Sequence, residues 1–197
     1  MVEKELCKIL IDSYKNDGFE VYEEVCSDGS NRRTDIVIVR NNIYHAIEVK
    51  TSLSEKVLEQ AYINKPYYHY TSIFVPLYKN LSIVKKDFIK NKGIGVLIID
   101  SINKIILTKF SPVLNRKPLK KKIDFIKKHG KKLNEYGEAG NNIGAYYTPF
   151  QETKRNIISF LKENPEGVTI KDIIKNIKTH YNTDTTAKVR LRKYLET

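Results

Sequence analysis

The sequence predicts an α/β fold with a mixed sheet core flanked by helices, followed by a small all-helical C-terminal domain. Over the first 110 residues, short runs rich in β-branched residues alternate with helical patterns. A segment with glycines and a proline, residues 134–150, then interrupts the pattern and is expected to be a linker. Only helical periodicity follows it. We therefore expect one domain over residues 1–133 and a helical module over residues 151–197.

Each element of the first domain follows from its pattern of apolar residues. Residues 2–16 predict an amphipathic helix that ends at an Asn-Asp-Gly turn. Strands are expected at residues 19–25, 34–40, 43–50, 70–77, 95–100 and 104–110, and helices at 54–63 and 83–91. A strongly basic stretch over 116–133 is expected to be partly helical, and the module to contain helices at 151–163, 170–178 and 184–195.

The second and third strands form a predicted hairpin whose turn sets a register. Asn41 and Asn42 are residues that tolerate the positive φ angles of a two-residue turn. With that turn, the residue numbers of every opposed pair add up to 83, so Asp35 lies opposite Glu48. Because side chains alternate along a strand, Lys50 shares the face of Glu48.

This register brings two acids and one lysine together between apolar strands. Directly opposed side chains have Cβ atoms roughly 4.5–5.5 Å apart, so the two carboxylates repel unless a positive charge lies between them. Carboxylate oxygens suit Mg²⁺, and the ammonium of Lys50 can polarise a water beside a phosphate. Hydrolysis of a phosphodiester is the predicted chemistry, and an ordinary surface cluster of salt bridges is the alternative.

The runs TDIVIVR and IYHAIEVK, between helices and strands in this order, resemble the restriction-endonuclease-like PD-(D/E)xK nuclease superfamily. Within it, the first 110 residues are similar to archaeal Holliday junction resolvases and to restriction and repair endonucleases. The resemblance implies Asp35, Glu48 and the main-chain carbonyl of Val49 as metal ligands and Lys50 as the catalytic lysine. It also implies Mg²⁺ as the cofactor, with Mn²⁺ able to substitute. Thr34 stands where the motif has its proline.

Two further residues are candidates by the same resemblance, which implies a glutamate on the first helix and a glutamine on the helix after the lysine. Helical phase selects Glu3, which falls on the inward stripe with Cys7, over Glu5, which points away. Gln60 occupies the place of the glutamine. The alternatives are a solvated glutamate near a frayed terminus and an ordinary surface glutamine.

The positive charge is concentrated in the C-terminal part of the chain. The formal net charge is +12; residues 1–110 carry 16 basic and 14 acidic side chains, whereas residues 111–197 carry 19 and 9. A compositional bias toward lysine would raise lysine everywhere, so the asymmetry favours contact with a polyanion.

Candidate phosphate contacts lie in the basic stretch and in the last helix of the module. They are Lys117, Lys120, Lys121, Lys122, Lys127, Lys128, Lys188, Arg190, Arg192 and Lys193. Three short helices resemble a winged-helix or helix-turn-helix module, whose last helix can enter a major groove or follow phosphates. The alternatives are a module whose charges are merely solvated and one that mediates dimerisation or binds a partner.

The sequence therefore favours a metal-dependent DNA endonuclease of restriction, repair or recombination type. A catalytically silent DNA-binding protein on a nuclease scaffold and an RNA nuclease remain alternatives, and a homodimer is left open. The N-terminus does not read as a signal peptide, no apolar run is long enough to span a membrane, and Cys7 and Cys26 are expected to be reduced. A cytoplasmic location with no membrane partner is expected.

Overall fold

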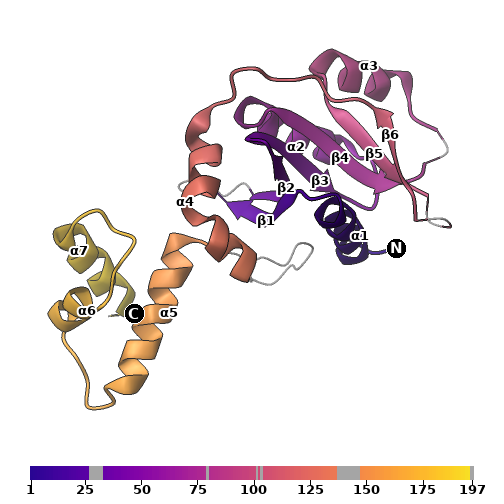
Figure 1. The fold of residues 1–197 in the computed structure, drawn as a ribbon. Helices are drawn as coiled ribbons and strands as arrows, with labels where there is room; N and C mark the ends of the chain where they lie inside the picture. The colour runs from indigo at the N-terminus through magenta and orange to yellow at the C-terminus, as the bar shows by residue number, and fades with distance from the viewer. Residues whose placement is uncertain (27–32, 79, 101, 103, 137–146, 196–197) are drawn as a thin grey trace. The chain divides into compact units, whose positions relative to one another are not determined.

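The first unit of the chain, residues 1–146, is built on a six-stranded mixed sheet with the strand order β1-β2-β3-β4-β5-β6. The computed structural model describes residues 1–26, 33–78, 80–100, 102, 104–136 and 147–195. The elements of this unit are α1 (Glu3–Asn16), β1 (Glu20–Cys26), β2 (Arg33–Arg40), β3 (Ile43–Val49), α2 (Glu55–Asn64), a 3-10 turn η1 (Lys65–Tyr67), β4 (Tyr70–Pro76), α3 (Ile83–Lys92), β5 (Gly95–Ile99), β6 (Ile106–Phe110) and α4 (Lys120–Tyr136). The predicted fold class, α/β with a mixed sheet and flanking helices, is confirmed (Figure 1).

The hairpin of β2 and β3 forms as the sequence predicts. Asn41 and Asn42 have φ angles of 52° and 60°, the left-handed conformation that a two-residue turn between antiparallel strands needs. Arg40 pairs with Ile43 and Val37 with Ala46, so the predicted register is confirmed along the paired part of the hairpin.

Strands β3, β4 and β5 run parallel because a helix crosses over between each of them. The side chain of Ser54 accepts a hydrogen bond from Val57 N and so caps the start of α2. Helix α3 ends at Gly93, whose φ of 61° provides the left-handed C-cap that favours glycine. These crossovers return the chain to the same end of each strand.

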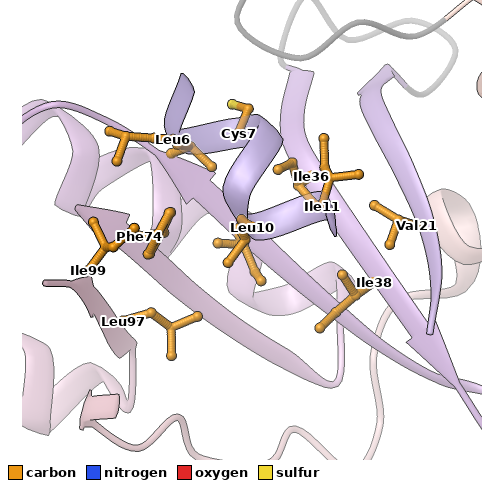
Figure 2. Close-up of a cluster of buried hydrophobic side chains, with 12 residues drawn as sticks. Leu6, Cys7, Leu10, Ile11, Val21, Ile36, Ile38, Phe74, Leu97 and Ile99 are labelled. Carbon is orange, nitrogen blue, oxygen red and sulfur yellow. The ribbon is translucent and has the colours of Figure 1, made fainter. Parts of the chain in front are cut away.

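Two apolar cores cover the two faces of the sheet. On one face, Leu6 and Leu10 of α1 lie over Ile36 of β2 and Phe74 of β4 (Figure 2). On the other face, Val57 and Ala61 of α2 and Ile89 of α3 pack against β4 and β5. Because both faces are covered, the inner strands β4 and β5 are buried along nearly their whole length, and a charged side chain buried in such a sheet requires a specific partner.

Helix α4 packs against β1 and closes the sheet at that edge (Figure 1). Gly130 allows the close approach, because a Cβ at this position would lie 2.9 Å from Cε1 of Tyr22. The inward side of α4 carries Ile123, Phe125, Ile126 and Leu133 together with one lysine, Lys122. The basic stretch, expected to be partly helical, forms an amphipathic helix from Lys120 onward.

The second unit, residues 147–197, contains the helices α5 (Pro149–Glu163), α6 (Ile170–Asn176) and α7 (Asp184–Leu195). Ile157, Ile173, Ile177 and Leu191 form its core. Ile158 and Val189, which apolarity alone would also assign to that core, are 43% and 65% exposed because they lie on the outer sides of their helices.

The predicted linker, residues 134–150, is shorter than expected at both ends. Helix α4 continues to Tyr136 and α5 begins at Pro149, while residues 137–146 lie outside the described residues. In the part of the chain that the structure describes, no helix has both the length and the apolar character needed to cross a membrane.

Candidate active site

The site lies at the end of the β2–β3 hairpin, where main-chain pairing stops. The last paired residues are Ile36 and Ile47. Beyond them, the carboxylate of Asp35 replaces a main-chain acceptor: its Oδ2 accepts a hydrogen bond of 2.9 Å from the main-chain N–H of Val49. The hairpin thus places Asp35 between the two strands rather than simply opposite Glu48, and it ties the carboxylate to the backbone beside the candidate catalytic residues.

Lys50 joins two acids that come from different elements. Its Nζ donates to Oδ2 of Asp35 at 2.8 Å and to Oε1 of Glu3 at 2.9 Å. The main-chain N–H of Lys50 donates to the carbonyl of Phe74 at 3.0 Å, which fixes its backbone to β4. Burial by itself would lower the pKa of Lys50, but the charges of Asp35 and Glu3 raise that pKa above its usual value.

The structure brings Glu3 to this cluster and gives Glu5 a different contact. Oε2 of Glu5 accepts a hydrogen bond of 2.9 Å from the main-chain N–H of Val2 at the start of α1. Glu3 therefore lies on the side of α1 that the helical phase indicates, whereas the side chain of Glu5 turns back to the main chain before the helix.

Glu48 is buried, with 1% of its surface exposed. Its Oε1 accepts a hydrogen bond of 2.5 Å from Nδ2 of Asn64, while its Oε2 is buried and has no hydrogen-bond partner. Burial and then the charge of the nearby Asp35 carboxylate raise the pKa of Glu48 well above its usual value, against the opposing charges of Lys50 and Lys122. One oxygen of this carboxylate thus remains without a donor in an interior where such an omission is costly.

A buried polar network, not predicted from the sequence, contacts Glu48 through Asn64. Asn64 and Lys122 both belong to it, and the 2.6 Å hydrogen bond from Nζ of Lys122 to Oδ1 of Asn64 joins them. The hydroxyl of Thr34 lies 3.2 Å from both Nζ of Lys122 and the Tyr68 hydroxyl, and the side chain of Tyr68 is fully buried. Thr34, at the proline position of the motif, is thus part of the polar interior.

Lys122 departs from the expectation that it contacts phosphate. It is 3% exposed, because it lies on the inward side of α4. Helical periodicity was an available signal: Lys122, Ile126 and Leu133 follow one another at spacings of four and seven residues, the spacing of a single helix face. Within a run of lysines, that signal is easily overlooked.

Gln60 does not join the cluster. It is half-buried on α2, and among the described residues it makes no hydrogen bond to Asp35, Glu48 or Lys50. Asn64, one helical turn later on the inward stripe of α2, makes the contact with Glu48 instead. Helix α2 therefore contributes Asn64 to the surroundings of Glu48, and the role predicted for Gln60 toward DNA stays a prediction.

The remaining candidate phosphate contacts are on the surface of their own units. Lys117 and, on α4, Lys120, Lys121, Lys127 and Lys128 are exposed. On α7, Lys188, Arg190, Arg192 and Lys193 are exposed, while Ala187 and Leu191 turn inward. Each unit thus presents a helix with a basic outer side to solvent.

The residues of the cluster fit a divalent metal of the Mg²⁺ type. Within the described ranges, no group of three or more His, Cys, Asp and Glu side chains converges to hold a metal ion. Mg²⁺, however, is commonly held by one or two carboxylates, with water and substrate oxygens as its other ligands. The unpartnered Oε2 of Glu48, next to Asp35, offers the oxygen that such an ion requires.

Comparisons with known proteins find likenesses in structure alone. No family model and no curated protein matches the sequence. The SPO1766 protein of unknown function from Silicibacter pomeroyi is similar with a TM-score of 0.50 and 13% identity, over 68% of this chain and 88% of that one. An XisH family protein from Nostoc punctiforme has a TM-score of 0.40 and 20% identity, over 54% and 98% of the two chains. An fdxN element excision controlling factor protein from Anabaena variabilis has a TM-score of 0.38 and 19% identity, over 52% and 95%. At these identities the first likeness concerns the fold alone, and the two weaker ones carry no argument about function.

Proposed function

We propose that the chain is a metal-dependent DNA endonuclease that hydrolyses phosphodiester bonds. The observation that carries this proposal is the buried carboxylate of Glu48, whose Oε2 has no hydrogen-bond donor and whose nearest charged neighbours include the carboxylate of Asp35, itself only an acceptor when ionised. Most buried side-chain oxygens in folded proteins have a hydrogen-bond partner, so an unpaired one requires an explanation. A cation bound at this site would provide the missing partner of Glu48 Oε2.

Asp35 and Glu48, with the main-chain carbonyl of Val49 implied by the resemblance, would hold the metal. A bound Mg²⁺ would neutralise charge on the phosphate and lower the pKa of a coordinated water. Lys50 supplies donors on the same side of the site, so its ammonium can orient a water and stabilise charge that develops on a phosphate oxygen. Glu3 holds that ammonium in place from α1.

The distribution of charge supports a nucleic acid as the substrate. The exposed lysines on α4 belong to the same unit as the acidic cluster, and the exposed basic residues of α7 give the second unit a similar surface. Phosphate contacts of this kind position a protein on DNA without reading its sequence. DNA is the substrate proposed, because the chain shows no aromatic-rich RNA-recognition motif.

The proposal is tested by incubating the protein with labelled duplex, branched and single-stranded DNA and with RNA, in Mg²⁺ or in EDTA. We expect Mg²⁺-dependent cleavage of DNA that K50A abolishes while DNA binding persists, because the lysine acts on the transition state. K56A, which removes an exposed lysine from α2, is the matched control and should cleave normally. Cleavage of RNA but not of DNA would show that the substrate is RNA.

A catalytically silent DNA-binding protein is the second candidate. One observation favours it: Nζ of Lys50 already has two carboxylate partners, which can neutralise the cluster without a metal. DNA binding by the wild-type protein, without cleavage in Mg²⁺ or Mn²⁺ and without metal binding, would establish this candidate over the endonuclease.

A further inference from the structure

The buried lysine of α4 has a specific set of polar and aromatic contacts. The Nζ of Lys122 donates to Oδ1 of Asn64 at 2.6 Å and to Oγ1 of Thr34 at 3.2 Å. It also lies 5.2 Å from the ring centroid of Tyr67 and 5.5 Å from that of Tyr68. Burial of a lysine is unfavourable unless such groups replace its water, so this site is built around the ammonium.

These contacts determine which way the amide of Asn64 points. A lysine ammonium is only a donor and a carboxylate is only an acceptor. With Lys122 on one side and Glu48 on the other, the amide must turn its oxygen to the lysine and its NH₂ to the acid. The opposite orientation would set the NH₂ against the ammonium and the carbonyl against the carboxylate.

With this orientation the amide of Asn64 presents a donor to one oxygen of Glu48. Asn64 donates to Oε1, at 2.5 Å, and Oε2 remains without a partner. The chain of contacts therefore runs from α4 through the end of α2 to the oxygen that the proposed function assigns to the metal.

We propose that Lys122 is a positioning residue that, through Asn64, holds the Glu48 carboxylate in the orientation that receives the metal. The hydrogen bond of the Lys122 ammonium is to Asn64, and its charge also acts on Glu48 through space. The inference rests on the proposed function and adds to it a residue from the lysine-rich helix. It also distinguishes Lys122 from the lysines Lys120, Lys121, Lys127 and Lys128 of α4, which are exposed to solvent.

The test compares K122M with K121M in the full-length protein. Both variants remove one lysine charge from α4, but Lys121 is exposed. Thermal unfolding is followed during a titration with MgCl₂, and each variant is referred to its own metal-free Tm, so that a general loss of stability does not move the result. DNA affinity is measured over a range of salt concentrations.

We expect K122M to shift the Mg²⁺ midpoint about ten-fold or more toward higher concentration, the range typical of lost outer-shell partners of metal ligands. Its DNA salt dependence should stay unchanged. K121M should keep the wild-type Mg²⁺ midpoint, and loss of one phosphate contact should reduce its salt slope by about 0.9. N64A should show the same Mg²⁺ shift as K122M, and the double variant should show no larger shift, because the two residues act in series.

A Mg²⁺ midpoint for K122M equal to that of K121M would overturn the inference. If circular dichroism shows that K122M does not fold, N64A decides, and a wild-type midpoint for that variant also overturns it. A wild-type protein that neither binds Mg²⁺ nor cleaves DNA would refute the proposed function itself. If instead the wild-type protein binds Mg²⁺ and K122M has the same Mg²⁺ midpoint, only the role of Lys122 is refuted and the proposed function stands.

Discussion

Replacing Glu48 with glutamine should make the metal-free protein more stable, although it removes a residue proposed to be essential. Glu48 is 1% exposed, and its Oε2 has no donor. Its charge is opposed by the neighbouring Asp35 and is only partly offset by Lys50 and Lys122. In E48Q, the new amide oxygen still accepts from Asn64 and the amide NH₂ can donate to Asp35.

The magnitude follows from the cost of a buried polar group without a partner, about 1–3 kcal/mol and more when the group is charged. The offsetting lysine charges keep the net gain for E48Q at about 1–3 kcal/mol. For a unit of this size, each kcal/mol shifts Tm by about 2–4 °C, so a rise of roughly 2–12 °C is expected.

The gain should also depend on pH, with a definite sign. Because the pKa of Glu48 is raised in the folded chain, its destabilising effect is absent below the ordinary carboxyl value of about 4.5 and complete above the folded pKa. The advantage of E48Q over the wild type should therefore shrink as the pH falls from above the raised pKa of Glu48 toward about 4.5.

The assay is thermal unfolding in EDTA, followed by far-UV circular dichroism or by tyrosine fluorescence, since the chain has 13 tyrosines and no tryptophan. E59Q, which makes the same change at an exposed position of α2, is the control and should shift stability by no more than about 0.5 kcal/mol. An E48Q protein that is less stable than the wild type, or that gains no more than E59Q, would refute the view that Glu48 is an uncompensated buried acid.

Three further predictions concern the metal, the first helix and the second unit. Mg²⁺ at about 100 times its dissociation constant should stabilise the wild-type protein by about 2.7 kcal/mol, and D35N should show no such response; an equal response would place the metal elsewhere. E3Q should slow single-turnover cleavage about 10- to 100-fold by releasing Lys50, whereas E5Q should cleave at the wild-type rate; equal rates for the two variants would remove Glu3 from the site. Deletion of residues 147–197 should weaken DNA binding and reduce its salt slope while Mg²⁺-dependent nicking persists at high protein concentration; unchanged affinity and slope would assign these helices to dimerisation or to another partner.

Local rules explain why the sequence sufficed for the hairpin and for the choice of acid on α1. The side-chain period of a strand and the positive φ angles of Asn41 and Asn42 determine the register without reference to the rest of the chain. The period of a helix similarly separates Glu3 from Glu5. Both are properties of neighbouring residues, which a sequence displays directly.

The immediate surroundings of Glu48 depend on contacts that no local pattern encodes. Asn64 and Lys122 are 58 residues apart in the chain, and they meet only because α4 packs beside the sheet next to the end of α2. For the same reason, the contact between Asn64 and Glu48 was not predicted: the crossing of α2 over β3 determines which turn of the helix reaches Glu48. The sequence by itself determined the register of the hairpin and identified the two acids and the lysine near its end. Only the tertiary structure decided that Lys122 is inside, because the side of a helix that is buried depends on the surface it packs against.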